Sequence, residues 1–137
     1  MNKVLLRLSF LMIIFTYLLG CDVMHDLIFM NKYTRDIYVI VDLNSIDNKI
    51  SSRSEVLRIP SKSTGRTSRL SSWGHYMKDS MHVYVLDAYL VDKAQPLNTT
   101  YITDEQTNAL EPDMILSRIT ILESSLYHRS NTVYISP

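Results

Sequence analysis

The amino-acid sequence predicts a mainly β protein, a single β-sandwich-like domain with one or two short helical turns; an α+β arrangement is the alternative. Three observations lead to this fold class. The 137 residues fit one domain rather than two. Four short stretches rich in apolar residues are separated by more polar segments, at 37–41, 83–91, 115–122 and 133–135. The chain has only three glycines, so tight two-residue hairpins are scarce and longer connections are expected.

The first two strands are expected at residues 36–42 and 55–59. The first is continuously apolar between its two aspartates rather than alternating, which indicates a strand covered on both faces. The second ends at Pro60, because proline cannot donate a hydrogen bond to a neighbouring strand. Residues 51–72 are rich in Ser, Thr and Arg, and we interpret them as a solvated loop with an edge strand rather than as an anion-binding patch.

The strongest strand pattern covers residues 81–91 and predicts the central strand of a sheet. Because side chains alternate along a strand, Asp87 would share one face with Val83 and Val85, and His82, Tyr84, Leu86 and Ala88 would lie on the other. Two further strands are expected at 114–121 and 132–136.

Two short helical segments are expected between and after these strands. Thr103 and Gln106 have the spacing of a capping box, and Pro112 limits the helix that they begin. Thr120 and Glu123 repeat this spacing, which predicts one further helical turn before the last strand.

Residues 1–20 have the anatomy of a secretory signal. Lys3 and Arg7 provide a positive start, and residues 8–19 form a short, almost wholly apolar run. The run is shorter than the ~20 residues of a membrane-spanning helix. An uncleaved anchor or a buried N-terminal helix is the alternative interpretation.

The apolar run ends in Leu18-Leu19-Gly20-Cys21, which resembles the lipobox of bacterial lipoproteins. The chain's single cysteine is at the end of this motif. The resemblance implies signal cleavage between Gly20 and Cys21, a diacylglyceryl thioether on the Cys21 sulfur and acylation of the new amino group. Two or more acyl chains give stable membrane attachment, at ~0.8 kcal/mol per buried methylene. A free reactive thiol is the alternative.

The predicted mature chain therefore consists of 117 residues, divided into a lipidated N-terminus with a tether at 21–35 and a β-rich domain at 36–137. Removing Lys3 and Arg7 leaves 12 basic against 14 acidic side chains, a net charge of −2. Nucleic acid is not expected as a partner, because phosphate binding needs a basic surface.

Several segments of the mature chain resemble a group of small uncharacterised lipoproteins of Bacteroides and its relatives. They are the early Asp36-Ile37-Tyr38-Val39, the long strand ending in Asp87-Ala88, the segment Ile115-Leu116-Ser117-Arg118 and a short last strand ending in Pro137. The resemblance implies a lipid-anchored protein of the cell envelope, and we expect the outer membrane, on its periplasmic or surface face, rather than the inner one. It implies no activity. The aromatic residue that these relatives have near Asn131 is absent here.

No constellation in the sequence indicates a metal or a cofactor, and none is expected. His75 and His82 are seven residues apart, and no histidine pair has the i, i+4 spacing of a helical metal site. Asp87 is the most interesting acid, because a carboxylate within an apolar strand needs a partner or its pKa rises. We expect Arg118 or a backbone turn to be that partner.

The sequence as a whole favours a non-enzymatic binding or structural module that contacts a protein or glycan. An envelope hydrolase using His75, His82 or Asp87 is the alternative. The tyrosines and the one tryptophan are expected mainly in the core.

Asp79-Ser80-Met81 resembles the acceptor motif of the Bacteroides O-glycosylation system, which would require Ser80 on an exposed turn.

Overall fold

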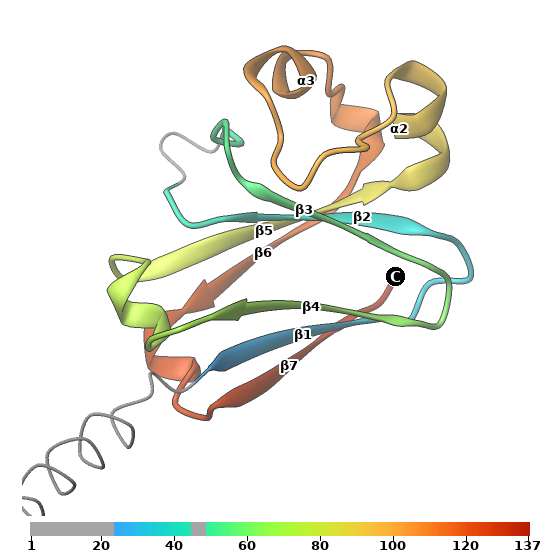
Figure 1. Ribbon diagram of the computed structural model, residues 1–137. Helices are drawn as coiled ribbons and strands as arrows, with labels where there is room; N and C mark the ends of the chain where they lie inside the picture. The colour runs from blue at the N-terminus through green and yellow to red at the C-terminus, as the bar shows by residue number, and fades with distance from the viewer. Residues whose placement is uncertain (1–23, 45–48) are drawn as a thin grey trace, which may run out of the picture.

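The computed structural model describes residues 24–44 and 49–137, which form two β-sheets packed face to face and a layer of short helices (Figure 1). The prediction of a mainly β, sandwich-like fold is confirmed. The predicted signal segment, its cleavage site after Gly20 and the lipidation site Cys21 lie outside the described residues.

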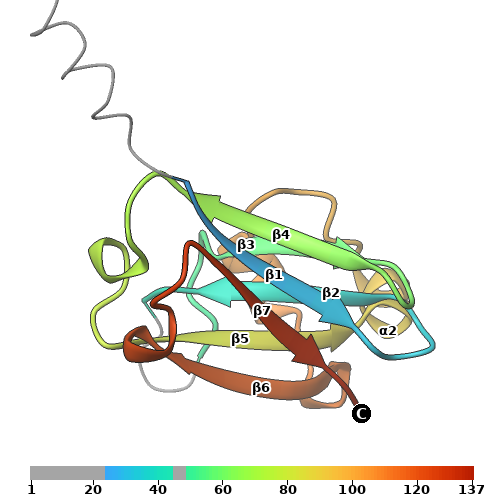
Figure 2. The same cartoon turned by 90° about the horizontal axis from the view of Figure 1, so that it is seen from below.

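The smaller sheet has the strand order β4-β1-β7, and the larger sheet has the order β3-β2-β5-β6. In the smaller sheet β1 is antiparallel to β4 and parallel to β7, whereas all neighbours in the larger sheet are antiparallel (Figure 2). The strands are β1 (His25–Asn31), β2 (Ile37–Asp42), β3 (Glu55–Ile59), β4 (Thr64–Arg69), β5 (Ser80–Asp87), β6 (Ile115–Leu122) and β7 (Ser130–Ile135).

The helical layer lies on the outer face of the larger sheet, opposite the smaller sheet (Figure 1). It contains α2 (Ala88–Ala94), α3 (Asp104–Asn108) and the 3₁₀ turn η2 (Pro112–Met114). Two more 3₁₀ turns, η1 (Trp73–His75) and η3 (Glu123–Ser125), connect the sheets. Within the described part of the chain, none of the helices has the length and apolar character needed to cross a membrane.

The two central strands of the larger sheet, β2 and most of β5, are buried on both faces, as their continuous apolar patterns predict. All six residues of β2 are buried: Val39 faces the smaller sheet, and Ile40 faces the helical layer. On β5, Val83 and Val85 face the inter-sheet core while Leu86 faces the helices. The central position expected for this strand is confirmed, since β5 pairs with both β2 and β6.

The predicted tether at 21–35 is wrong, because residues 25–31 form the central strand of the smaller sheet. Leu27 and Phe29 of β1 are fully buried against the larger sheet. Polar residues at both ends of this strand, and apolar Ile28 on its outer face, hide the alternation that marks a strand with one buried face. The folded domain therefore begins about ten residues earlier than the sequence pattern predicts.

The predicted strand 81–91 is too long at its C-terminal end. The strand ends at Asp87, and Ala88 begins α2. The reason is local: Asp87 Oδ1 accepts hydrogen bonds from the backbone N–H groups of Tyr89 (3.0 Å) and Leu90 (3.4 Å), so its carboxylate is the N-cap of the helix.

The two predicted capping boxes have different outcomes. Thr103 and Gln106 form a complete capping box at the start of α3. The box predicted for Thr120 and Glu123 is wrong, because Thr120 lies within β6 and the N-cap of η3 is Leu122, which has no side-chain cap hydrogen bond. The turn itself exists, but it is a 3₁₀ turn.

Candidate binding site at the open flank of the sandwich

For the buried acid Asp87, the predicted partner Arg118 is wrong, whereas the alternative, a backbone turn, is confirmed by the N–H groups at the start of α2. Asp87 Oδ2 accepts from Arg35 Nη1 at 2.6 Å, and its Oδ1 caps α2. Arg118 is the cross-strand neighbour of Tyr84, and its guanidinium lies 5.5 Å from the Tyr84 ring on the outer face of the sheet. Asp87 is three residues further along β5, so its side chain points to the opposite face.

The three candidate hydrolase residues do not gather around one point. His82 lies on the outer face of β5, and Asp87 lies five residues away on the inner face, roughly 17 Å along the strand. His75 is exposed in η1, with its ring edge against Tyr76. Among residues 24–44 and 49–137 no group of three His, Cys, Asp or Glu could hold a metal ion.

His82 is nevertheless placed in a polar environment beside β6. Its Nδ1 lies 3.1 Å from both Arg118 Nη2 and Thr120 Oγ1. Burial lowers the pKa of His82, the charge of Arg118 lowers it further, and Asp42 opposes the shift. Because the arginine donates, Nδ1 accepts, which fits an uncharged ring.

Ser80 is the first residue of β5 and is half-buried, opposite Leu122 of β6. The residue before it, Asp79, is exposed. The acceptor motif thus overlaps the start of a strand instead of lying on the exposed turn that glycosylation would require.

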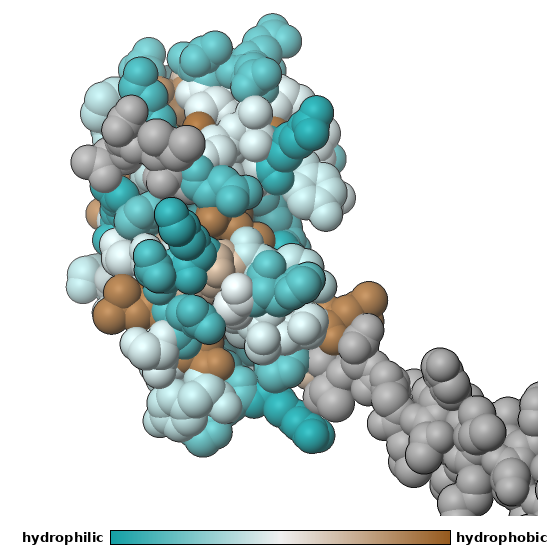
Figure 3. Space-filling model, turned by 90° about the vertical axis from the view of Figure 1, so that its left-hand side faces the viewer, coloured by the Kyte–Doolittle hydropathy of each residue, from teal (hydrophilic) through white to brown (hydrophobic). Residues whose placement is uncertain are grey.

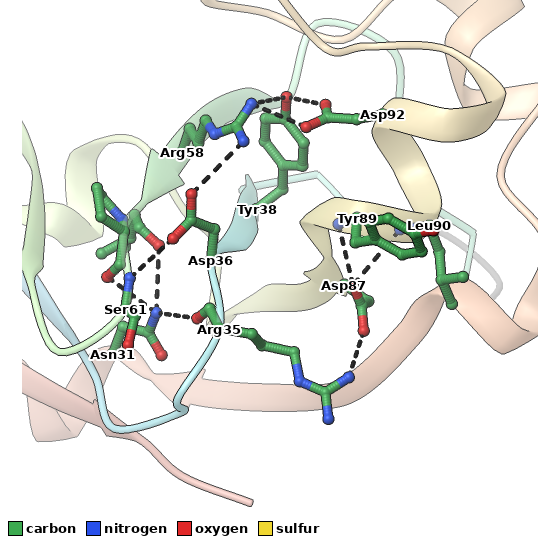
Figure 4. Close-up of polar contacts among 12 residues, drawn as sticks. Asn31, Arg35, Asp36, Tyr38, Arg58, Ser61, Asp87, Tyr89, Leu90 and Asp92 are labelled. Carbon is green, nitrogen blue, oxygen red and sulfur yellow. Dashed lines mark hydrogen bonds and ion pairs between the residues drawn. The ribbon is translucent and has the colours of Figure 1, made fainter.

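A polar network fastens the helical layer to one end of the larger sheet (Figure 4). The Tyr38 hydroxyl donates to Asp92 Oδ1 of α2 at 2.6 Å, and Arg58 Nη1 lies 2.9 Å from Asp92 Oδ2. Burial raises the pKa of Tyr38, and the hydrogen bond and charge of Asp92 raise it further. The same arginine reaches Asp36 at 3.5 Å. These groups satisfy one another, which indicates a structural role.

On the side of the sandwich formed by β3 and β4, which we call the closed flank, the outer edge of β3 is covered and charged side chains join the two sheets. The outer edge of β3 is covered by residues 100–102: Val56 N donates to Thr100 O (2.7 Å), and Ile102 N donates to Ser54 O (2.9 Å). Between the two sheets, Glu55 accepts from Thr67 Oγ1 (2.6 Å) and from Arg69 Nη2 (2.9 Å).

The opposite side, formed by β6 and β7, is an open flank. β6 pairs only with β5, and β7 pairs only with β1. In the described part of the chain, no backbone group lies hydrogen-bonded along the other edge of either strand. Along β6, the backbone groups of about every second residue point to this edge, and they meet no backbone partner among the described residues.

Apolar side chains line this open flank. Leu116, Ile119, Leu126 and Val133 are only partly buried, at the margin of the inter-sheet core. A cavity of about 460 Å³ lies between β6, η3 and β7. A second cavity of about 520 Å³ lies at the start of β6, under α3; its lining includes Ile50, Tyr84, Leu110, Pro112 and Ile115. The β6 edge thus runs between two hollows in the surface.

The open flank has little of the usual protection of an edge strand. Natural sheets block their edges with charges, prolines or bulges. β6 contains one charged residue, Arg118, one register irregularity near its start and no proline, and β7 contains neither a charge nor a proline. Sequence reasoning predicted both strands but missed this feature, because strand order is not visible in the pattern of either segment. The low charge of both strands was the signal available.

The exposed tyrosines do not form a single platform. Trp73 and Tyr84 are buried as expected, whereas the side chains of four other tyrosines are exposed on separate elements. These four are Tyr89 on α2, Tyr101 before α3, Tyr127 after η3 and Tyr134 on β7.

Comparison with known proteins finds no relative of this chain. No family model matches the chain. No curated protein and no solved structure matches it either.

Proposed function

We propose that this protein is a lipid-anchored binding module of the bacterial cell envelope, which holds an extended segment of a partner protein along β6. The observation that carries the proposal is the weakly charged edge of β6 between two cavities, which no strand of the described chain covers. A polypeptide that adds a strand to such an edge gains main-chain hydrogen bonds, and its alternate side chains enter the pockets on either side.

The two faces of an added strand would meet different surroundings. On the inner face its side chains would cover Ile119 and Leu116 and so extend the inter-sheet core. On the outer face they would lie beside Arg118 and the cavity under α3. Burial of the apolar margin at ~25 cal/mol per Å² would add to the backbone hydrogen bonds.

The anchor is proposed on the Leu18-Leu19-Gly20-Cys21 motif, and the outer membrane is the proposed location. A protein segment is favoured over a glycan, because sugar recognition uses flat exposed rings and the exposed tyrosines lie apart. Binding is favoured over hydrolysis because His82 and Asp87 lie on opposite faces of β5.

Site-specific photo-crosslinking in the envelope of a bacterial host from the Bacteroides group tests the proposed edge. A photoreactive residue replaces Thr120 on β6, and the matched control replaces Arg66, which is exposed on β4 of the closed flank. A crosslinked partner is expected from Thr120 and none from Arg66. Equal crosslinking at both positions, or none at Thr120, would contradict the proposal.

A second measurement asks whether the partner adds a strand. The crosslinked segment, made as a synthetic peptide, should slow amide hydrogen exchange in β6 and leave exchange in β3 and β4 unchanged. Slowed exchange elsewhere without a change in β6 would assign the partner to another surface.

A further inference from the structure

A second surface lies at the end of the sandwich where the described chain begins, which we call the N-terminal pole. The start of β1 lies there beside the end of β4, since His25 pairs with Arg69, and beside the start of β7, since Asp26 pairs with Ser130. The turns η1 and η3 lie at the same end, and the C-terminus lies at the other (Figure 1).

Exposed apolar side chains gather at this pole. The described residues include seven large hydrophobic side chains that are exposed, and four of them lie here: Met24 (49% exposed), Leu70 (56%), Leu122 (55%) and Tyr127 (78%). They come from four separate segments, namely the start of β1, the end of β4, the end of β6 and the connection to β7. Figure 3 faces this end and shows hydrophobic side chains among hydrophilic ones.

The polar groups of the pole suit the interface of a lipid bilayer. Lys78 and Arg129 are exposed there and can meet anionic headgroups. Tyr127, whose ring lies 4.2 Å from that of His128, has the amphipathic character of interfacial aromatics. Exposed Asp79 and Glu123 offset the two cations, so insertion of apolar side chains would supply most of the attraction.

The length of chain before β1 limits where this pole can lie. Only residues 22–24 separate Cys21 from His25, and four residue steps span at most roughly 14 Å. A tether over 21–35, as the sequence pattern predicts, would allow roughly 50 Å. Since β1 is the central strand of its sheet, a lipid on Cys21 would hold the whole N-terminal pole at the membrane.

We infer that the N-terminal pole is a membrane-contact surface, with Met24, Leu70 and Tyr127 inserted at the boundary between headgroups and acyl chains. This inference rests on the proposed lipid anchor and adds the orientation of the domain. β6 then runs with its Leu122 end at the bilayer and its Ile115 end away from it. The open flank would face sideways, where a partner in the same envelope can reach it.

The test uses the full chain, purified in its processed form from a bacterial host of the Bacteroides group and reconstituted in vesicles of phosphatidylethanolamine and phosphatidylglycerol. The variant Leu70→Cys carries an environment-sensitive fluorophore, and Tyr89→Cys on α2 is the matched exposed control. A lipidated Cys21 does not react with the label. We expect a blue shift and loss of aqueous quenching at Leu70, with neither change at Tyr89.

Two readouts separate this inference from the anchor itself. Vesicle flotation with an intact mass that includes the acyl chains establishes the anchor. If the protein floats but the fluorophore at position 70 is quenched as fast as that at position 89, the anchor stands and the membrane-contact surface is wrong. If the protein neither floats nor has the lipid mass, both proposals fail. In a further pair of proteins the fluorophore is placed at Lys78→Cys, once in the otherwise native chain and once together with Met24→Ser, Leu70→Ser and Tyr127→Ser. Both proteins should float. The fluorophore should be protected from quenching in the first protein and lose that protection in the second.

Discussion

The two flanks of the sandwich differ in whether the outer strands of the sheets are covered. On the closed flank, the edge of β3 is covered by residues 100–102, and Glu55 ties β3 to β4 through Thr67 and Arg69. On the open flank, β6 and β7 each pair on one side within the described residues, and half-buried Leu116 and Val133 border the core. Within one domain, the difference separates a region held by contacts between the sheets from the region where we propose that a partner binds.

The ion pairs follow the same division. The five ion pairs found between described residues join β1, the turn after it, β3, β4, the end of β5 and α2. None of these five includes a residue of β6 or β7. A partner strand could therefore add to the open flank without breaking any of them, and substitutions on the two flanks should have different consequences.

The largest effect is expected from Phe29→Ala in β1. The ring is fully buried between the sheets, so its loss should lower the free energy of unfolding by about 3–5 kcal/mol. Leu116→Ala on the open flank should cost less, about 2 kcal/mol, because that side chain is only partly buried. Urea unfolding measures both. Equal costs would mean that the margin of the core at Leu116 is packed as tightly as its centre. An unchanged free energy of unfolding for Phe29→Ala would mean that residues 25–31 are a tether and not a buried strand.

An intermediate effect is expected from Glu55→Ala on the closed flank. It leaves Arg69 and Thr67 without their carboxylate partner at a mostly buried position, which should cost about 2 kcal/mol. The matched substitution on the open flank, Thr120→Ala, removes an exposed contact and should change stability by less than ~0.5 kcal/mol. Thermal unfolding of the two variants checks this contrast, and a larger loss from Thr120→Ala would reverse it.

A smaller effect should appear when the pH is lowered. The folded protein lowers the pKa of His82, so below the ordinary value of 6.5 the unfolded imidazole takes up a proton before the folded one does. Stability should therefore decrease as the pH falls below 6.5 toward the folded-state pKa, and His82→Gln should remove this part of the dependence. Unfolding midpoints measured over that range test the sign; His128→Gln, at an exposed position, is the control.

The smallest effect on stability is expected from charges placed on the open edges. Thr120→Lys and Thr132→Lys alter exposed positions on β6 and β7 and should leave the free energy of unfolding within ~0.5 kcal/mol. They should nevertheless abolish strand addition, because charged side chains block edge pairing. The synthetic peptide made from the crosslinked segment should then no longer slow amide hydrogen exchange in β6 of Thr120→Lys. Exchange slowed as much as in the native chain would mean that a charge at this edge does not prevent strand addition.

Several features of the fold could be predicted from sequence because they depend on neighbouring residues alone. The unbroken apolar run of β2 indicated burial on both faces, and the helices and the smaller sheet provide that cover. Thr103 and Gln106 indicated a capping box, and the box is present. Both patterns act over a few residues, so no knowledge of the distant chain is needed.

Other features could not be predicted because their partners are distant in the chain. Asp87 needed a partner, but whether Arg35 or Arg118 supplies it depends on which face each side chain reaches. β1 lacks a clear alternation and is a strand because β4 and β7, over 30 and 100 residues further on, pair with it. The unprotected edge of β6 likewise exists only because the chain order places no strand beside it within the described residues.

The sequence alone determined the mainly β composition of the domain, the burial of β2 on both faces and the expectation of a lipid anchor at Cys21. Only the tertiary structure decided where the domain begins, which acid pairs with which base and which edges remain open. The physical reason is the range of the interactions: capping and alternation are set within one turn or one strand, whereas strand order and edge pairing follow from how distant segments bury apolar surface together.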